Sequence, residues 1–300
     1  MRPLGPPRGP PGARPGLALG LACLGTLLSL LVPAAARPQE PPTLAPFLEE
    51  LEAAGRRFEN VSVAVAEGYR RLGPDFPGMG EHWIHPGLVI AGELDPRRPP
   101  ALGYTLVEGR RVLVSFAYTR VLGPGDELPA GPFPAGAWHD HTGGVDEESL
   151  LLSGPMTAHG GHEAFRLAMV HIWLGVDNPD GTLAQSNWTL PFVRLGLPGP
   201  ERVTSQAARA LSLSSAEGRE FYDAMLRDGV RLQGPDLELA SRAFDEAARQ
   251  AALQRERIII GTGAASEEDL GALEGVWSDL WQRLDGMLVP SSLDAMQVLR

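Results

Sequence analysis

The sequence has no lysine and only one cysteine, so two of the most reactive side chains in proteins are almost missing from its 300 residues. All 26 basic residues are therefore arginines. The one cysteine, Cys23, cannot form a disulfide within the chain, and it lies in an apolar run near the N-terminus. If that run is removed, no thiolate remains to bind a metal, and the ligands left are imidazole, carboxylate, amide oxygen and thioether.

Several enzyme signatures are missing as well. The chain has no Gly-x-Ser-x-Gly elbow, no Walker loop and no Gly-x-Gly-x-x-Gly segment after a strand, and His162-Glu163 lacks the second histidine of a His-Glu-x-x-His motif. We therefore expect neither nucleotide binding nor serine hydrolysis. Acidic residues outnumber basic ones by 37 to 26, which gives a net charge of −11 and leaves no basic stripe for a nucleic acid.

Residues 1–36 have the composition of an export signal. Three arginines precede an apolar run from Leu17 to Val32, and small residues suited to cleavage follow at 34–36. Loss of these three arginines and no acidic residue would change the net charge from −11 to −14, so the mature domain should avoid anionic lipid. We expect a periplasmic or extracellular protein with a linker at 37–43. An uncleaved N-terminal membrane anchor is the alternative.

The apolar spacing in the rest of the chain predicts an α+β fold. From Leu44 to Phe58, apolar residues recur every three or four positions, which predicts an amphipathic helix, and the same spacing allows the helix to continue through Tyr69 and to end at Gly73-Pro74. A β-rich core should follow from about 76 to 196, within a domain that spans 44–198. Residues 199–300 should form three or four helices, with Ser266 as the N-cap of the last long one. This helical C-terminal region would be a scaffold, a lid or the face of a homo-oligomer.

Three segments of the core have the pattern of strands. Residues 101–107 and 111–121 flank Glu108-Gly109-Arg110 and should form a β-hairpin, with Val112, Val114 and Phe116 on one face of its second strand. Residues 165–174 alternate in polarity and should form a core strand, although a helix is the competing interpretation. As a strand, it would place Phe165, Leu167, Met169, His171 and Trp173 on one side.

All seven histidines lie between His82 and His171, which is less than a third of the chain. Neutral imidazole is the commonest protein ligand for zinc, copper, nickel or iron, so this confinement favours a metal site. His82 follows a glycine-rich turn that could close on an ion, and it forms the preferred ligand pair with His171. The competing interpretation is structural: His82 would be hydrogen-bonded in a turn above Trp83, and His171 would be a satisfied core histidine.

Three further histidines complete the predicted ligand set. His139 and His141 would share one face of an extended segment, and His85 precedes Pro86. His139 and His141 could instead belong to a polar surface loop. His159 and His162 flank a Gly-Gly pair that could equally be an exposed loop, so we leave them outside the set.

Two methionines near the preferred pair bear on which metal is bound. Met169 precedes His171 by two residues, and Met79 precedes His82 by three. A thioether ligand would favour copper, whereas a core methionine would only fill space. We therefore expect a transition-metal ion, and zinc, copper and iron all stay open.

A set of short motifs extends from about Val61 to Pro191. The motifs are Ala66-Glu67-Gly68-Tyr69, the loop PGMGEHW at 77–83, Leu94-Asp95-Pro96, His171-x-Trp173, Asn178-Pro179-x-Gly181 and Asn187-Trp188. With them the chain resembles a family of small, mostly exported bacterial proteins of unassigned function. The resemblance implies that His82 and His171 are the shared pair, but it brings no known reaction. Thr105 stands where that family has a glutamate, so a role for that carboxylate is in doubt.

Three functions fit these observations. The first is an exported protein that binds a transition metal. The second is a metal-dependent hydrolase or oxidoreductase on the same site, with Asp140 or Glu81 as general base. The third is a binding or scaffold protein without a metal, whose helical half forms the partner surface.

Overall fold

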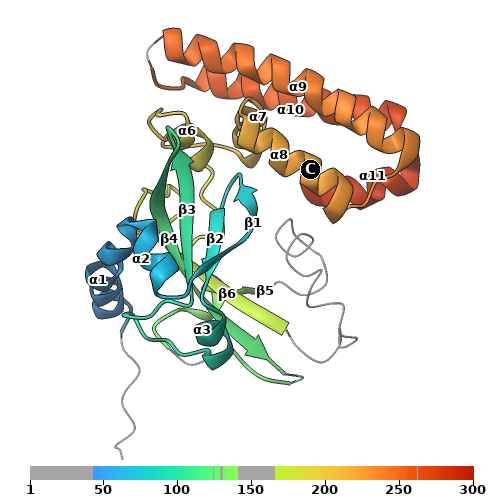
Figure 1. Ribbon diagram of the computed structural model, residues 1–300. Helices are drawn as coiled ribbons and strands as arrows, with labels where there is room; N and C mark the ends of the chain where they lie inside the picture. Colours follow the sequence, from blue (N-terminus) through green and yellow to red (C-terminus); the bar gives the residue numbers. More distant parts are fainter. Residues whose placement is uncertain (1–42, 124, 129–130, 141–165, 262) are drawn as a thin grey trace, which may run out of the picture. The chain divides into compact units, whose positions relative to one another are not determined.

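The computed structural model describes residues 43–300 apart from 124, 129–130, 141–165 and 262. Contacts divide the chain between Glu40 and Pro41, and all described helices and strands belong to the second unit (Figure 1). The expected α+β class is confirmed, because one antiparallel sheet is combined with helices on both sides of it in the sequence. The expected export signal and the short acidic helix near 146–152 lie outside the described residues.

The sheet has six strands in the order β1-β2-β3-β4-β6-β5, and every neighbouring pair is antiparallel. The strands are β1 Arg70–Phe76, β2 Gly80–Ile84, β3 Ala101–Val107, β4 Arg110–Leu122, β5 His139–Asp140 and β6 Arg166–Trp173. The helix α3, Pro86–Ala91, follows β2, and a short 3-10 turn, Ala135–Ala137, precedes β5. The predicted core strand at 165–174 is therefore confirmed as β6.

The β3–β4 hairpin is confirmed, but one residue interrupts its alternation. Glu108 and Gly109 have positive φ angles of 50° and 77°, which fit a tight turn between twisted strands. Gly103 pairs with Ser115 whereas the next residue, Tyr104, pairs with Leu113, so Val114 is the extra residue of a β-bulge. The expectation that Val114 shares a face with Phe116 is therefore wrong.

The amphipathic helix expected from Leu44 is confirmed, but its continuation through Tyr69 is wrong. The chain forms α1 (Leu44–Gly55), a 3-10 turn (Arg56–Glu59) and α2 (Val61–Ala66). Asn60 separates the last two, because its backbone is extended and its side chain accepts a hydrogen bond from the Ser62 amide as the N-cap of α2. Gly73-Pro74 lies inside β1, at the irregularity between Leu72 and Asp75.

One face of the sheet is covered by these N-terminal helices. Phe47 and Leu51 of α1 and Phe58 of the 3-10 turn are buried in one cluster with Phe116 of β4 and Ile172 of β6. Ala168 and Val170 of β6 belong to the same cluster. The alternating residues of β6, Met169, His171 and Trp173, therefore face the opposite side, as the sequence pattern predicted.

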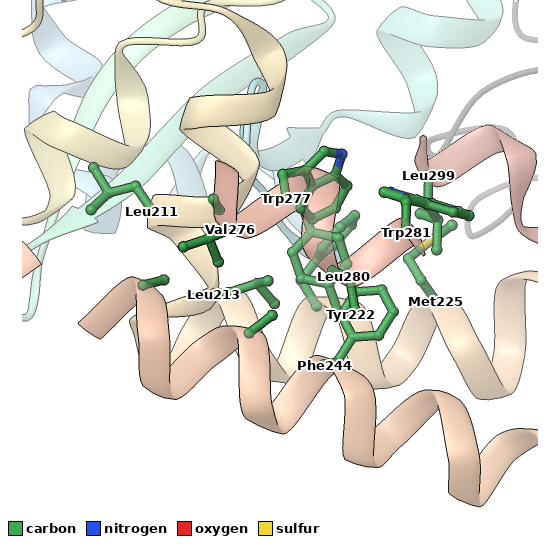
Figure 2. Close-up of a cluster of buried hydrophobic side chains, with 14 of the residues drawn as sticks. Leu211, Leu213, Tyr222, Met225, Phe244, Val276, Trp277, Leu280, Trp281 and Leu299 are labelled. Carbon is green, nitrogen blue, oxygen red and sulfur yellow. The ribbon is translucent and has the colours of Figure 1, made fainter. Parts of the chain in front are cut away.

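The region 199–300 is helical, as predicted, but its described part forms five α-helices and not the three or four expected. These are α7 Ser205–Leu213, α8 Ala216–Ala224, α9 Gly234–Ile260, α10 Glu267–Met287 and α11 Pro290–Met296, with a π-helical turn Met225–Gly229 after α8 and a 3-10 turn Gln297–Leu299 after α11. The short helix α6, Leu190–Arg194, precedes this region, and Phe76 and Met79 join its aromatic core. Figure 2 shows Tyr222 beside Phe244 and Trp277. The centroid of its ring lies 5.3 Å from that of Phe244 and 5.7 Å from that of Trp277. None of the helices in the described part of the chain is both long and apolar enough to cross a membrane.

Ser266 is the N-cap of α10, as the sequence predicted. Its hydroxyl accepts a hydrogen bond from the Asp269 amide, and the Asp269 carboxylate accepts one from the Ser266 amide, which forms a capping box. We expect Ser266→Ala to lower the free energy of unfolding by about 1 kcal/mol, as measured by urea denaturation. Ser278→Ala, an exposed position inside the same helix, is the control and should change it by less than about 0.5 kcal/mol.

Candidate functional site

His82 on β2 and His171 on β6 meet over the face of the sheet opposite α1. Their Nε2 atoms are 3.5 Å apart, and the two side chains are only 3% and 2% exposed. In a flat sheet, strands separated by three strand spacings would lie about 14 Å apart. The two rings can meet only because the sheet curves and the side chains reach across it.

Small residues between the two histidines leave room for this approach. His82 pairs with Gly103 in the next strand, Gly103 pairs with Ser115, and His171 pairs with Ala117. A Cβ atom on Gly103 would lie 2.0 Å from the Ser115 hydroxyl oxygen. The floor of the site is therefore built from residues with little or no side chain.

The orientation of His171 is fixed by the backbone of a loop. Its Nδ1 lies 2.6 Å from the carbonyl oxygen of Gln185. Because a carbonyl oxygen only accepts, Nδ1 carries a proton, and in the neutral ring Nε2 then carries the lone pair. A hydrogen bond from one ring nitrogen to a backbone carbonyl, with the other nitrogen directed at a metal, is the usual arrangement of a histidine ligand.

A thioether lies beside this nitrogen. Met169 Sδ is 3.1 Å from His171 Nε2, and the Met169 side chain is 4% exposed. Met79, the other methionine noted in the sequence, packs in the helical core with Phe192 and Phe221. The structure thus brings Met169 to the histidine pair and places Met79 among apolar side chains.

Aromatic rings enclose the histidine pair. The ring of Phe76 contacts His82 edge-on with centroids 5.5 Å apart, and it contacts Phe221 of α8 at the same distance. Trp173 lies 6.0 Å from His171 on the same face of β6. Phe76 therefore links the histidine pair to the C-terminal helices, although those helices contain no histidine.

His139 is the third histidine that the structure brings to this place. It lies on β5 opposite Met169, and its ring centroid is 5.0 Å from that of His171 in an edge-to-face arrangement. Its side chain is half-buried. The predicted ligand His141, together with His159 and His162, lies outside the described residues, as does the side chain of Asp140.

His85 does not join the pair. It is the N-cap residue of α3, where its Nδ1 accepts a hydrogen bond of 3.2 Å from the Leu88 amide. Its ring lies 5.4 Å from that of Tyr69. A histidine in a cap needs no metal to explain it, and the sequence showed only that His85 precedes the proline that begins the helix.

Glu81 is bound by arginines and is unsuited to act as a general base. Its fully buried carboxylate accepts hydrogen bonds from Arg111 at 2.6 and 3.1 Å and from Trp83 at 3.1 Å, and Arg71 lies 3.3 Å away. Burial alone would raise the pKa of Glu81, but these donors and charges outweigh it and lower the pKa below its usual range. Since neighbours on a strand face opposite sides, Glu81 also points away from His82.

The segment 177–189 joins the two histidine strands. Trp173 donates its amide to the Thr182 carbonyl at 2.8 Å, and the Asn187 amide donates to the Gly78 carbonyl at 2.7 Å. Trp188 lies so close to Gly78 that a Cβ atom there would be 2.9 Å from its ring. The loop at 77–83 and the motifs around 171–188, about 90 residues apart in sequence, therefore meet in space.

Gln185 is the contact that sequence reasoning missed. Its contribution to His171 is a backbone carbonyl, which every residue type possesses. No side-chain pattern could have indicated it. The only available signal was indirect, namely the turn-forming Asn178-Pro179-Asp180-Gly181 that shapes the loop.

A pocket of about 630 Å³ lies beside Trp173 and is lined with polar groups that include Asp177, Asn178 and Glu201. Neither His82 nor His171 lines it. Within the described ranges, no three or more His, Cys, Asp or Glu side chains are grouped closely enough to hold a metal ion. Among the described residues, the site contains a pair of imidazoles and a thioether, and His139 lies against one of the rings.

Comparison of the chain with protein-family models, with curated proteins and with solved structures finds no match in any of the three.

Proposed function

We propose that this is an exported protein that binds a transition-metal ion through the Nε2 atoms of His82 and His171. The observation that carries the proposal is the 3.5 Å separation of these two atoms in a buried place. Two nitrogens, each about 2.0–2.1 Å from one ion, are 3.5 Å apart when the angle at the ion is about 117°. That angle lies between the tetrahedral and the trigonal values, so the pair fits an ion with little rearrangement.

The hydrogen bond from His171 Nδ1 to the Gln185 carbonyl supports the same proposal. It selects the tautomer whose Nε2 lone pair can bind a cation. The competing explanation is a direct hydrogen bond between the two imidazoles. A separation of 3.5 Å is long for such a bond, because most N–H donors lie 2.7–3.2 Å from their acceptors.

The geometry favours metal binding over catalysis by a bound metal. Glu81 is held by Arg111 and Arg71, so it is not available to accept a proton, and the polar pocket beside Trp173 does not open onto His82 or His171. A metal-binding protein needs only ligands, whereas a hydrolase also needs a base and room for a substrate.

The proposal is tested by loading the purified protein with copper, zinc and iron in turn and measuring bound metal by elemental analysis after dialysis. We expect about one equivalent of one of these metals. His82→Gln and His171→Gln should each lower its affinity by at least about 100-fold, because each removes a ligand rather than a supporting contact. Less than about half an equivalent of every metal would rule the proposal out.

His85→Gln is the matched control for these two variants. It removes a histidine from the same part of the sequence, but one that caps α3. Metal affinity should stay within about threefold of the wild-type value, while the free energy of unfolding should fall by about 1 kcal/mol. Equal loss of affinity in all three variants would show that unfolding, and not ligation, is being measured.

The proposed export is supported by the arginines, the apolar run and the small residues of positions 1–36. N-terminal sequencing of the protein from a bacterial periplasm should find a start near Arg37. Recovery of the uncleaved chain in the membrane fraction would instead favour the N-terminal anchor.

A further inference from the structure

We propose that the metal is monovalent copper, held by His82 Nε2, His171 Nε2 and Met169 Sδ in a three-coordinate site. The inference rests on the proposed metal binding and names the ion and the third ligand. It is carried by the position of Met169, whose sulfur lies 3.1 Å from the same nitrogen that faces His82.

The backbone presents Met169 and His171 together. They are two residues apart on β6, so both point to the same face, and both are buried. An ion placed between the two imidazole nitrogens would lie next to the sulfur. A methionine side chain has three rotatable bonds, so the sulfur can shift by the few tenths of an ångström that ligation requires.

The chemical nature of the donors selects the ion. A thioether is a soft ligand that prefers Cu(I), and imidazole binds copper well. Zinc sites usually add carboxylate, thiolate or further imidazole ligands until four are present. The described residues provide no group of three or more His, Cys, Asp and Glu side chains for that purpose.

The charge of the ion gives a second argument. His82, His171 and Met169 are all neutral as ligands, and Phe76 and Trp173 enclose the pair with apolar rings. Burying an ion that its ligands do not neutralise costs free energy that rises steeply with its charge. A monovalent ion is therefore favoured over a divalent one in this surrounding. The angle of about 117° between the nitrogens also suits three ligands arranged around one ion.

The test compares two metals on one protein. Cu(I) affinity is measured under a reductant by competition with bicinchoninate, and Zn(II) affinity by competition with a chromogenic chelator. We expect Cu(I) to bind at least about 100-fold more tightly than Zn(II).

Met169→Leu, which keeps the side-chain volume, should lower the Cu(I) affinity at least about tenfold and leave the Zn(II) affinity within about threefold of the wild-type value. Met79→Leu, a buried methionine in the helical core, should change neither.

X-ray absorption of the copper-loaded wild-type protein gives a readout that needs no variant. One sulfur and two nitrogen neighbours are expected around the copper. If copper binds without a sulfur neighbour, or if Met169→Leu binds Cu(I) as tightly as the wild type, Met169 is not a ligand and this inference is overturned while metal binding stands. If neither metal binds, the proposed function fails as well.

Discussion

Replacing Arg194 with methionine should lower the free energy of unfolding by about 3–5 kcal/mol, because it leaves a buried carboxylate without its positive partner. Arg194 of α6 forms a largely buried ion pair with Asp75 of β1. Its guanidinium also donates to the carbonyls of Phe76 at 2.6 Å and Pro77 at 3.1 Å, and to the Thr105 hydroxyl at 2.7 Å. One side chain therefore holds the β1–β2 turn against β3.

The stability lost in Arg194→Met should increase as the pH rises. Burial raises the pKa of Asp75, and the nearby Arg194 lowers it in part. Without Arg194, the pKa of Asp75 in the folded protein rises further above the pKa of the same residue in the unfolded chain. At a pH above the unfolded-state pKa, the cost of ionising the buried carboxylate therefore lowers the free energy of unfolding by more. Urea denaturation should therefore show a smaller deficit for Arg194→Met near about pH 5 than near about pH 8.

The double variant Asp75→Asn, Arg194→Met separates charge from packing. It removes the buried charge but still lacks the bonds to Phe76 and Pro77. We expect it to recover part of the stability lost in Arg194→Met and to lose the pH dependence. A double variant that is less stable than Arg194→Met at both pH values would contradict the explanation.

Gly218→Ala should destabilise the helical region by about 3 kcal/mol, because there is no room for a methyl group. Gly218 lies in the first turn of α8, where its amide donates to the N-cap Ser215. An added Cβ atom would lie 1.9 Å from the backbone oxygen of Ser212 and 2.5 Å from its carbon. Backbone atoms cannot rotate away as a side chain can, so α8 or the preceding turn would have to move.

Gly275→Ala is the matched control for this prediction. Gly275 lies inside α10, where an added Cβ atom meets nothing within 4 Å. Alanine is favoured over glycine in a helix, so the control should raise the free energy of unfolding by about 0.5–1 kcal/mol. Thermal denaturation should therefore move the melting temperatures of the two variants in opposite directions. A shift of both in the same direction would show that the clash at Gly218 is not the cause.

Short sequence patterns predicted helix starts and tight turns well, because one or two residues determine the structure at such places. Helix α10 begins where the sequence indicated, because Ser266 caps it. The β3–β4 turn was equally clear from Glu108-Gly109. The segment from Leu44 to Tyr69 was mistaken for one helix, because its apolar spacing continues across Asn60 although the backbone there is extended. The bulge at Val114 gave no sequence signal, since it depends on how two strands pair.

The histidine pair was predictable and its geometry was not. The confinement of histidines and the motifs around His82 and His171 identified the two residues. Their meeting depends on the curvature of four strands and on the small size of Gly103, Ser115 and Ala117, which are properties of the assembled sheet. The sequence also made His85 a candidate metal ligand, but its role as the N-cap of α3 became visible only in the structure.

The bond between His171 and the Gln185 carbonyl has a consequence for how the sequence can vary. Because the acceptor is a backbone carbonyl, the residue type at position 185 can change without changing the tautomer of His171. Selection on that tautomer would fall instead on the residues that shape the loop, such as Asn178, whose side chain donates to the Ser186 carbonyl, and Asn187, whose side chain donates to the Asp177 carbonyl. In descendants of this chain, positions 178 and 187 should thus tolerate fewer substitutions than the residue that contacts the histidine.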